Sequence, residues 1–160
     1  MTKEFTHIED DRAVMVDIGQ KDIVTRRAVA SGEIVLSSET IEKIRTGTVE
    51  KGNVLSTARV AAILAVKKTP ELIPMCHQIP ITSIDVNFSI FDDHISASAE
   101  VSSVGKTGVE MEALTGVSVA LLAVWDMVKS AEKDNTGNYP CTGIREIKVV
   151  EKVKGTKANV

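Results

Sequence analysis

Hydrophobic and polar residues alternate strictly in the middle of the chain. The even positions from Ile84 to Ile90 are apolar, the odd positions from Ile95 to Val101 are apolar, and the residues between them are polar. Asp92 and Asp93 separate the two runs. This period of two predicts a β-hairpin with one buried face.

Helical patterns flank the hairpin on both sides. Ser38 to Arg45 is typical of a short helix that ends at Gly47. Asn53 is a suitable N-cap for an apolar helix over 54–68, which is expected to end before Pro70.

The longest helical pattern covers Gly105 to Lys129, and its second half is apolar or small all round, which predicts a buried helix. Thr107 and Glu110 have the spacing of a capping box. Asp126 is an exception inside this apolar helix, and such exceptions often mark functional sites. Small residues recur at helical spacing, so another backbone is expected to approach closely; they are Ala113, Gly116, Ala120 and Ala123.

The remaining predicted strands are Met15 to Ile18, Thr25 to Leu36 with an interruption at Gly32, and Ile144 to Val153. The combined order predicts an α+β fold of the ferredoxin-like βαββαβ type. It is a two-layer sandwich with both helices on one face of an antiparallel sheet, plus an N-terminal extension. We expect one domain over 13–155, with flexible ends at 1–12 and 156–160.

Composition excludes several classes of protein. A net charge of −3 and 3% aromatic residues argue against nucleic-acid binding, so an anionic ligand would need a local basic cluster. Two cysteines form no disulfide framework, and no signal segment or membrane span is apparent. The chain is therefore expected to be cytoplasmic and to have no membrane partner.

Four features have both a functional and a structural interpretation. Cys76-His77 lacks the ligand number and spacing of a zinc site, and His77 is either an acid, base or ligand contact or a surface residue. Lys51 beside Gly52 is a phosphate contact or, taken alone, more often a solvated lysine.

The loop before the long helix, 105–108, lacks full Walker spacing, although a helix N-terminus favours anions. Asp126 and Lys129 form either a simple intrahelical ion pair or a proton-transfer pair.

Taken together, these residues closely resemble the cyclic pyranopterin monophosphate synthase family of molybdenum-cofactor biosynthesis. The resemblance covers nearly the whole chain, and the segment 105–129 is the most specific part of it. The matching segments are MVDI at 15–18, KGN at 51–53, TAR at 57–59, LIPMCHQ at 72–78, GKTGVEMEALTGVSVALLAVWDMVK at 105–129 and KD at 133–134.

The resemblance implies a phosphorus–oxygen lyase with ferredoxin-like subunits. It would form a homohexamer, a trimer of dimers, with active sites at subunit contacts. Its substrate would be the cyclic guanosine triphosphate intermediate made by the radical SAM enzyme of the pathway, and its products cyclic pyranopterin monophosphate and diphosphate. No cofactor is required, and Mg²⁺ with the substrate phosphates stays open.

Carried over by motif, Asp126 would be the catalytic acid/base and Lys129 its partner. We expect the phosphates to need the positive charge of Lys51, Arg26 and a C-terminal lysine, for which Lys152 is preferred over Lys154 and Lys157. The full expected substrate-binding set is Met75, Cys76, His77, Glu110, Met111, Glu112, Lys51, Arg26 and Lys152. No metal ligands are expected.

Three hypotheses of different classes follow. The first is the lyase. The second is a non-catalytic nucleotide- or pterin-binding oligomer, which has no use for the Asp126 carboxylate beside a phosphate site, where it would repel the ligand. The third is a scaffold subunit, which would leave His77 and Lys51 unexplained.

Overall fold

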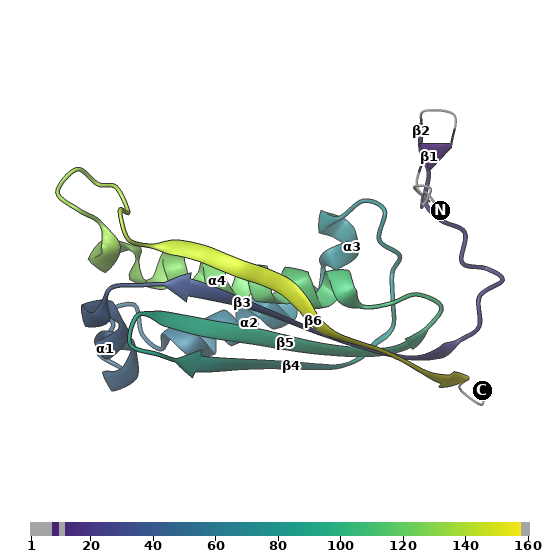
Figure 1. Cartoon of the computed structure of the whole chain (residues 1–160), viewed down its shortest axis with the longest axis horizontal. Helices are drawn as coiled ribbons and strands as arrows, with labels where there is room; N and C mark the ends of the chain where they lie inside the picture. Colours follow the sequence, from purple (N-terminus) through teal and green to yellow (C-terminus); the bar gives the residue numbers. More distant parts are fainter. Residues whose placement is uncertain (1–7, 10–11, 158–160) are drawn as a thin grey trace.

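The computed structural model describes residues 8–9 and 12–157. Most of the two ends expected to be flexible, 1–12 and 156–160, lies outside the described residues, and the division into domains stays a prediction. Figure 1 shows a sheet of long strands with two long helices behind it. The elements are β1 (Ile8–Glu9), β2 (Arg12–Ala13), β3 (Val24–Val35), α1 (Ser38–Thr46), α2 (Val54–Lys67), α3 (Thr69–Leu72), β4 (Ile81–Ile90), β5 (His94–Gly105), α4 (Glu110–Glu132) and β6 (Gly143–Lys157).

The main sheet has the strand order β4-β5-β3-β6, and every neighbouring pair is antiparallel. With α2 and α4 as the two crossover helices, this is the ferredoxin-like arrangement that the sequence predicts. The hairpin is β4–β5, in which Val86 pairs with Ala99 and Phe88 with Ala97, so the apolar positions share one face. The predicted fold class is confirmed.

The strand β3 continues through Gly32, and the interruption expected there is seen only as a shift of its register with β6 between Ser31 and Glu33. A Cβ atom at Gly32 would lie 2.9 Å from Leu121 and 3.0 Å from Val117, both on α4. The glycine therefore leaves room for α4 to lie close to the sheet, which is why the strand tolerates it.

The start of α4 differs from the prediction. The helix begins at Glu110, its N-cap is Val109, and no side chain caps it, so the Thr107 capping box is wrong. The carboxylate of Glu110 instead forms an ion pair with Lys152 of β6. Glu110 therefore contacts Lys152, which is distant in the sequence, instead of forming the local capping hydrogen bond that its spacing from Thr107 favours.

Three of the four small residues of α4, Ala113, Gly116 and Ala120, are buried inside the chain, and Ala123 is half-buried. Ala113 and Ala120 have no exposed surface, and a Cβ atom at Gly116 would lie 2.8 Å from Val66 of α2. The close approach that the spacing predicts is therefore confirmed at Gly116, but α2 of the same chain makes it. The buried part of this stripe is not available to a second subunit.

By length and mean hydropathy, α4 alone among the described helices is apolar enough to cross a membrane, and half of its most apolar window is buried. It packs on α2 and on the inner face of β3 and β5. These contacts are those of a core helix.

The predicted strand over Met15 to Ile18 is wrong, because these residues are irregular. The Asp17 carboxylate accepts a hydrogen bond of 2.7 Å from the Gly19 amide, which turns the chain. Val16 and Ile18 are half-buried and line a cavity instead of pairing with a strand. The apolar residues at alternate positions, Val16 and Ile18, are thus explained by burial against the cavity and not by a strand.

The caps of α1 and α2 agree with the sequence. Gly47 ends α1 in the left-handed conformation with φ 70°, and Asn53 accepts a hydrogen bond of 2.9 Å from the Ser56 amide at the start of α2. The strand β6 is longer than predicted and continues to Lys157.

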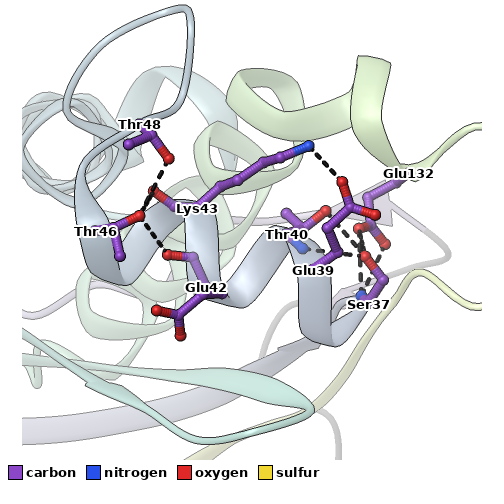
Figure 2. Close-up of polar contacts among 8 residues, drawn as sticks. All are labelled: Ser37, Glu39, Thr40, Glu42, Lys43, Thr46, Thr48 and Glu132. Carbon is purple, nitrogen blue, oxygen red and sulfur yellow. Dashed lines mark hydrogen bonds and ion pairs between the residues drawn. The ribbon is translucent and has the colours of Figure 1, made fainter.

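A buried carboxylate ties the end of α4 to two other segments. Glu132 is 8% exposed and accepts hydrogen bonds from the Ser37 hydroxyl at 2.7 Å and from the Thr142 hydroxyl at 2.5 Å. Figure 2 shows its carboxylate meeting the first turn of α1 at Ser37 and Thr40. Burial alone would raise the pKa of Glu132, but the hydrogen bonds from Thr142, Thr40 and Ser37 outweigh it and hold the pKa low.

Candidate active site

A cavity of about 350 Å³ lies beside the N-terminus of α4, and we call it the front cavity. It is formed by the segment before β3, the loop before β4, the start of α4 and one residue of β6. Its lining residues are Val16, Ile18, Lys21, Met75, Cys76, His77, Ile79, Thr107, Gly108, Glu110, Met111, Glu112 and Lys152.

Most of the expected substrate-binding residues gather in this one cavity, from three separate parts of the sequence. They are Met75, Cys76, His77, Glu110, Met111, Glu112 and Lys152. The sequence analysis did not single out Lys21 or Thr107 as lining residues. Lys21 lies three residues after the MVDI segment at 15–18. The resemblance in that segment is the one sequence feature that could have pointed to Lys21 as a site residue.

The loop between Pro74 and Pro80 positions Met75, Cys76 and His77, which are all half-buried. The Cys76 amide donates a hydrogen bond of 3.0 Å to the Ile73 carbonyl at the start of the loop. At its end, the Ser103 hydroxyl of β5 donates to the Pro80 carbonyl at 2.9 Å. Both ends of the loop are therefore held by hydrogen bonds.

Glu112 is the buried charged group of the front cavity, with 2% of its surface exposed. Burial raises the pKa of its carboxyl above the ordinary range, and the neighbouring charge of Glu110 adds to the effect. No ion pair with Glu112 occurs among the described residues. The pKa of the Cys76 thiol is raised as well, first by burial and then by Glu112.

Of the candidate C-terminal lysines whose side chains the structure describes, Lys152 lines the front cavity and Lys154 does not. Lys152 pairs with Glu110 on the opposite wall. The resemblance left this choice open, and the geometry favours Lys152 because it is the lysine of β6 that reaches the cavity.

Asp126, Lys129 and Lys51 form a second cluster near the other end of α4. The Lys129 ammonium lies 2.7 Å from one Asp126 oxygen, and the Lys51 ammonium lies 3.3 Å from the other. Lys51 also donates to the Asp126 carbonyl at 2.7 Å. We call these three residues the aspartate–lysine cluster.

The aspartate–lysine cluster is exposed on the subunit, with 60% of the Asp126 side chain accessible. The apolar surroundings of Asp126 in the sequence had implied a buried carboxylate. The structure shows instead that this carboxylate is exposed. Hydrogen bonds from Lys129 and then Lys51 lower the pKa of Asp126, and the same contact with Asp126 raises the pKa of Lys129. The carboxylate is stabilised in its ionised form.

Arg26 lies neither in the front cavity nor in the aspartate–lysine cluster. Its guanidinium donates to the Lys106 carbonyl at 3.4 Å, and it lines a separate cavity of about 340 Å³ between β3, β5 and β6. The Nε atom is buried and has no hydrogen-bond partner in the part of the chain that the structure describes. The structure therefore does not bring Arg26 into the front cavity.

Glu112 and Asp126 are both on α4, fourteen residues apart, which is about 21 Å along a helix axis. The front cavity and the aspartate–lysine cluster are therefore distinct within one chain. Within residues 8–9 and 12–157, no three His, Cys, Asp or Glu side chains gather closely enough to hold a metal ion.

The fold and these two sites define a ferredoxin-like protein with a charged small-molecule cavity at one end of its long helix. The chain belongs to the MoaC family, whose model matches residues 15–155.

Three similar proteins carry the name "Probable cyclic pyranopterin monophosphate synthase". The one from Methanosarcina acetivorans is 76% identical over 153 residues, covering 96% of this chain and 97% of the relative. The one from Methanococcoides burtonii is 71% identical over 98% of this chain and 99% of the relative. The one from Thermococcus kodakarensis is 60% identical over 96% of this chain and 98% of the relative.

Proposed function

We propose that this protein is a cyclic pyranopterin monophosphate synthase, a phosphorus–oxygen lyase of molybdenum-cofactor biosynthesis. It would convert the 3′,8-cyclised dihydro derivative of guanosine triphosphate into cyclic pyranopterin monophosphate and diphosphate. The family and the names of the similar proteins support this activity. The observation in the structure that carries it is the buried Glu112, which forms no ion pair among the described residues, in a cavity that His77 and Lys152 also line.

The chemistry of the front cavity suits a purine-derived ring. Glu110 and Glu112 offer acceptors for the N–H groups of a guanine-type edge. His77 offers imidazole nitrogens that donate or accept hydrogen bonds. Lys152, which pairs with Glu110 in this state, supplies positive charge for a phosphate.

The aspartate–lysine cluster supplies the second half of the chemistry. We assign proton transfer to Asp126, with Lys129 holding it ionised through their 2.7 Å contact. Lys51, on the opposite side of the carboxylate, is placed to neutralise the departing diphosphate. A Mg²⁺ ion with the phosphates is compatible with this scheme, and no other cofactor is proposed.

We propose that one active site combines the front cavity of one subunit with the aspartate–lysine cluster of another. The separation of about 21 Å along α4 is too long for one substrate to bridge easily within a chain. The outer surface of the helix layer exposes Val60, Leu64 and Leu122, each to more than half, which suits a subunit contact. A homohexamer built as a trimer of dimers, located in the cytoplasm, fits this arrangement.

The substrate is expected to come from the radical SAM enzyme of the same pathway. The direct test is to incubate the purified protein with the cyclic triphosphate and to measure diphosphate and the cyclic pterin product. Formation of both supports the lyase. Tight binding of the triphosphate without product would support the non-catalytic binding oligomer instead.

A further inference from the structure

Glu112 lies between two cavities. One is the front cavity, and the other, which we call the rear cavity, has a volume of about 190 Å³. Glu112 and Ile79 line both, so they form the partition between the two spaces. The other lining residues of the rear cavity are Val66, Lys67, Pro70, Glu71, Gln78 and Ile81.

The rear cavity is open to solvent at its polar lining residues. Lys67, Glu71 and Gln78, which line it, are all exposed. Since a water molecule takes about 30 Å³ of liquid volume, the rear cavity has room for several. A polar mouth and a carboxylate at its inner end give such waters hydrogen-bond partners.

A substrate in the front cavity would remove the water on that side of Glu112. With 2% of its surface exposed, Glu112 has little other contact with solvent. Glu112 is a second carboxyl group suited to proton transfer besides Asp126, and a group that transfers a proton in repeated turnovers must recover its protonation state each time. With the front cavity filled, the rear cavity is the remaining opening to solvent among the cavities that Glu112 lines in the described part of the chain.

We propose that the rear cavity is the route by which Glu112 exchanges protons with solvent while substrate occupies the front cavity. Gln78 and Glu71 are positioning residues at its mouth. The proton leaves the Glu112 carboxylic acid for a water in the rear cavity and passes on to bulk solvent, and the reverse transfer restores the acid. The proposal rests on the proposed function for the identity of the substrate.

Titratable and charged groups on several elements line the same two cavities as Glu112, and of these Glu110 raises its pKa through its charge. The pKa of Glu112 is raised mainly by burial, so it is sensitive to any loss of neighbouring water. The titratable and charged groups that line the two cavities with it are Lys21, Lys67, Glu71, Cys76, His77, Glu110 and Lys152.

The first test measures the free protein and needs no activity. Gln78→Phe and Ile81→Phe each place a ring in the rear cavity from a different segment without changing charge, and Gln78→Asn is the matched control. A ¹³C NMR titration of the Glu112 carboxyl should show a higher pKa in both Phe variants, because the expelled water no longer solvates the carboxylate. The control should titrate as wild type. An unchanged pKa in both folded Phe variants overturns the proposal.

The second test measures turnover of the cyclic triphosphate. In Gln78→Phe, kcat should fall at least about tenfold with KM unchanged, the solvent deuterium isotope effect on kcat should rise, and imidazole buffer should restore part of the rate. An unchanged kcat and isotope effect in this variant overturns the proposal. If the Phe variants raise the Glu112 pKa but the wild-type protein does not turn over the cyclic triphosphate, the rear cavity still serves as the proton route. The proposed function is then wrong.

Discussion

Two carboxylates on α4 have opposite electrostatic environments. Burial raises the pKa of Glu112, whereas Lys129 and Lys51 lower the pKa of the exposed Asp126. Glu112 therefore holds its proton to a higher pH than Asp126 does. Pairs of groups whose environments separate their pKa values in this way are typical of acid–base chemistry.

Replacing the exposed carboxylate should separate catalysis from folding. Asp126→Asn keeps the shape of the side chain but cannot take up a proton, so we expect turnover to fall by about 10²–10⁴-fold while the thermal unfolding midpoint stays close to wild type. Steady-state kinetics with the cyclic triphosphate and a thermal melt measure both. Activity within a few-fold of wild type would remove Asp126 from the mechanism.

The two candidate phosphate lysines should act on binding. Lys51→Ala and Lys152→Ala each remove a charge-assisted contact with a phosphate, which we expect to weaken triphosphate binding by about tenfold or more. Lys148→Ala is the matched control, because among the described residues Lys148 pairs only with Glu146, at 3.0 Å, and lines neither the front nor the rear cavity. Calorimetric titration gives the affinities. Equal affinities for all three variants would place the phosphate site elsewhere.

At the residue scale, sequence spacing predicts contacts only where they are local. The Asp126–Lys129 ion pair is expected from i, i+3 spacing and is present. The contact between Lys51 and Asp126 spans 75 residues, and only the resemblance placed both at one site. The position of Arg26 outside the front cavity depends on the register of β3 with β5, which no local pattern reports.

At the element scale, Glu132 joins α4 to the start of α1 and to the loop before β6. Its pKa is held low in the folded protein, since the hydrogen bonds outweigh the effect of burial. The folded state therefore binds fewer protons than the unfolded chain, and this contribution to stability is present above the unfolded pKa. It is lost as pH falls through the lowered folded value.

The variant Glu132→Gln tests this connection. It loses the charge that strengthens the hydrogen bonds from Ser37 and Thr142, so we expect a loss of about 1–3 kcal/mol in the free energy of unfolding at neutral pH. Urea unfolding at several pH values measures it, and the difference from wild type should shrink as the pH falls below the ordinary glutamate pKa. Glu42→Gln, an exposed change in α1 shown in Figure 2, is the control and should stay within about 0.5 kcal/mol. Equal stability of the two variants would contradict this role.

Periodicity predicts the long elements well, since burial of one face determines both the pattern and the strand or helix. The hairpin β4–β5 and the helix α2 agree with it. Their ends are less predictable where a tertiary contact intervenes. Thr107 has the right spacing to cap α4, yet Glu110 pairs with Lys152 of β6 and the helix starts three residues later.

At the scale of the whole molecule, the front cavity and the aspartate–lysine cluster lie at different positions along α4. In the proposed active site, each is contributed by a different subunit. The buried small residues of α4, Ala113, Gly116 and Ala120, cannot join two subunits, because they face the interior of the chain and Gly116 lies against α2. The helix layer exposes Leu122, Val60 and Leu64, which is the surface that the proposed subunit contact would use. The sequence shows an apolar helix but cannot distinguish its inner from its outer face.

The central claim is that one active site draws on two subunits, and mixing inactive variants tests it. Glu112→Ala lacks the buried carboxylate of the front cavity, and Asp126→Ala lacks the carboxylate of the aspartate–lysine cluster. The two proteins are mixed under conditions of subunit exchange, which is verified by mass spectrometry of differently labelled chains. Some subunit contacts then carry both wild-type groups.

The account predicts that turnover of the cyclic triphosphate returns to a measurable fraction of wild type in the mixture, while each variant alone stays inactive. Mixing Glu112→Ala with a double variant that lacks both carboxylates is the control, and it should stay inactive because no contact then carries both groups. Confirmed exchange with no return of activity would show that Glu112 and Asp126 serve the same chain, which contradicts the shared site.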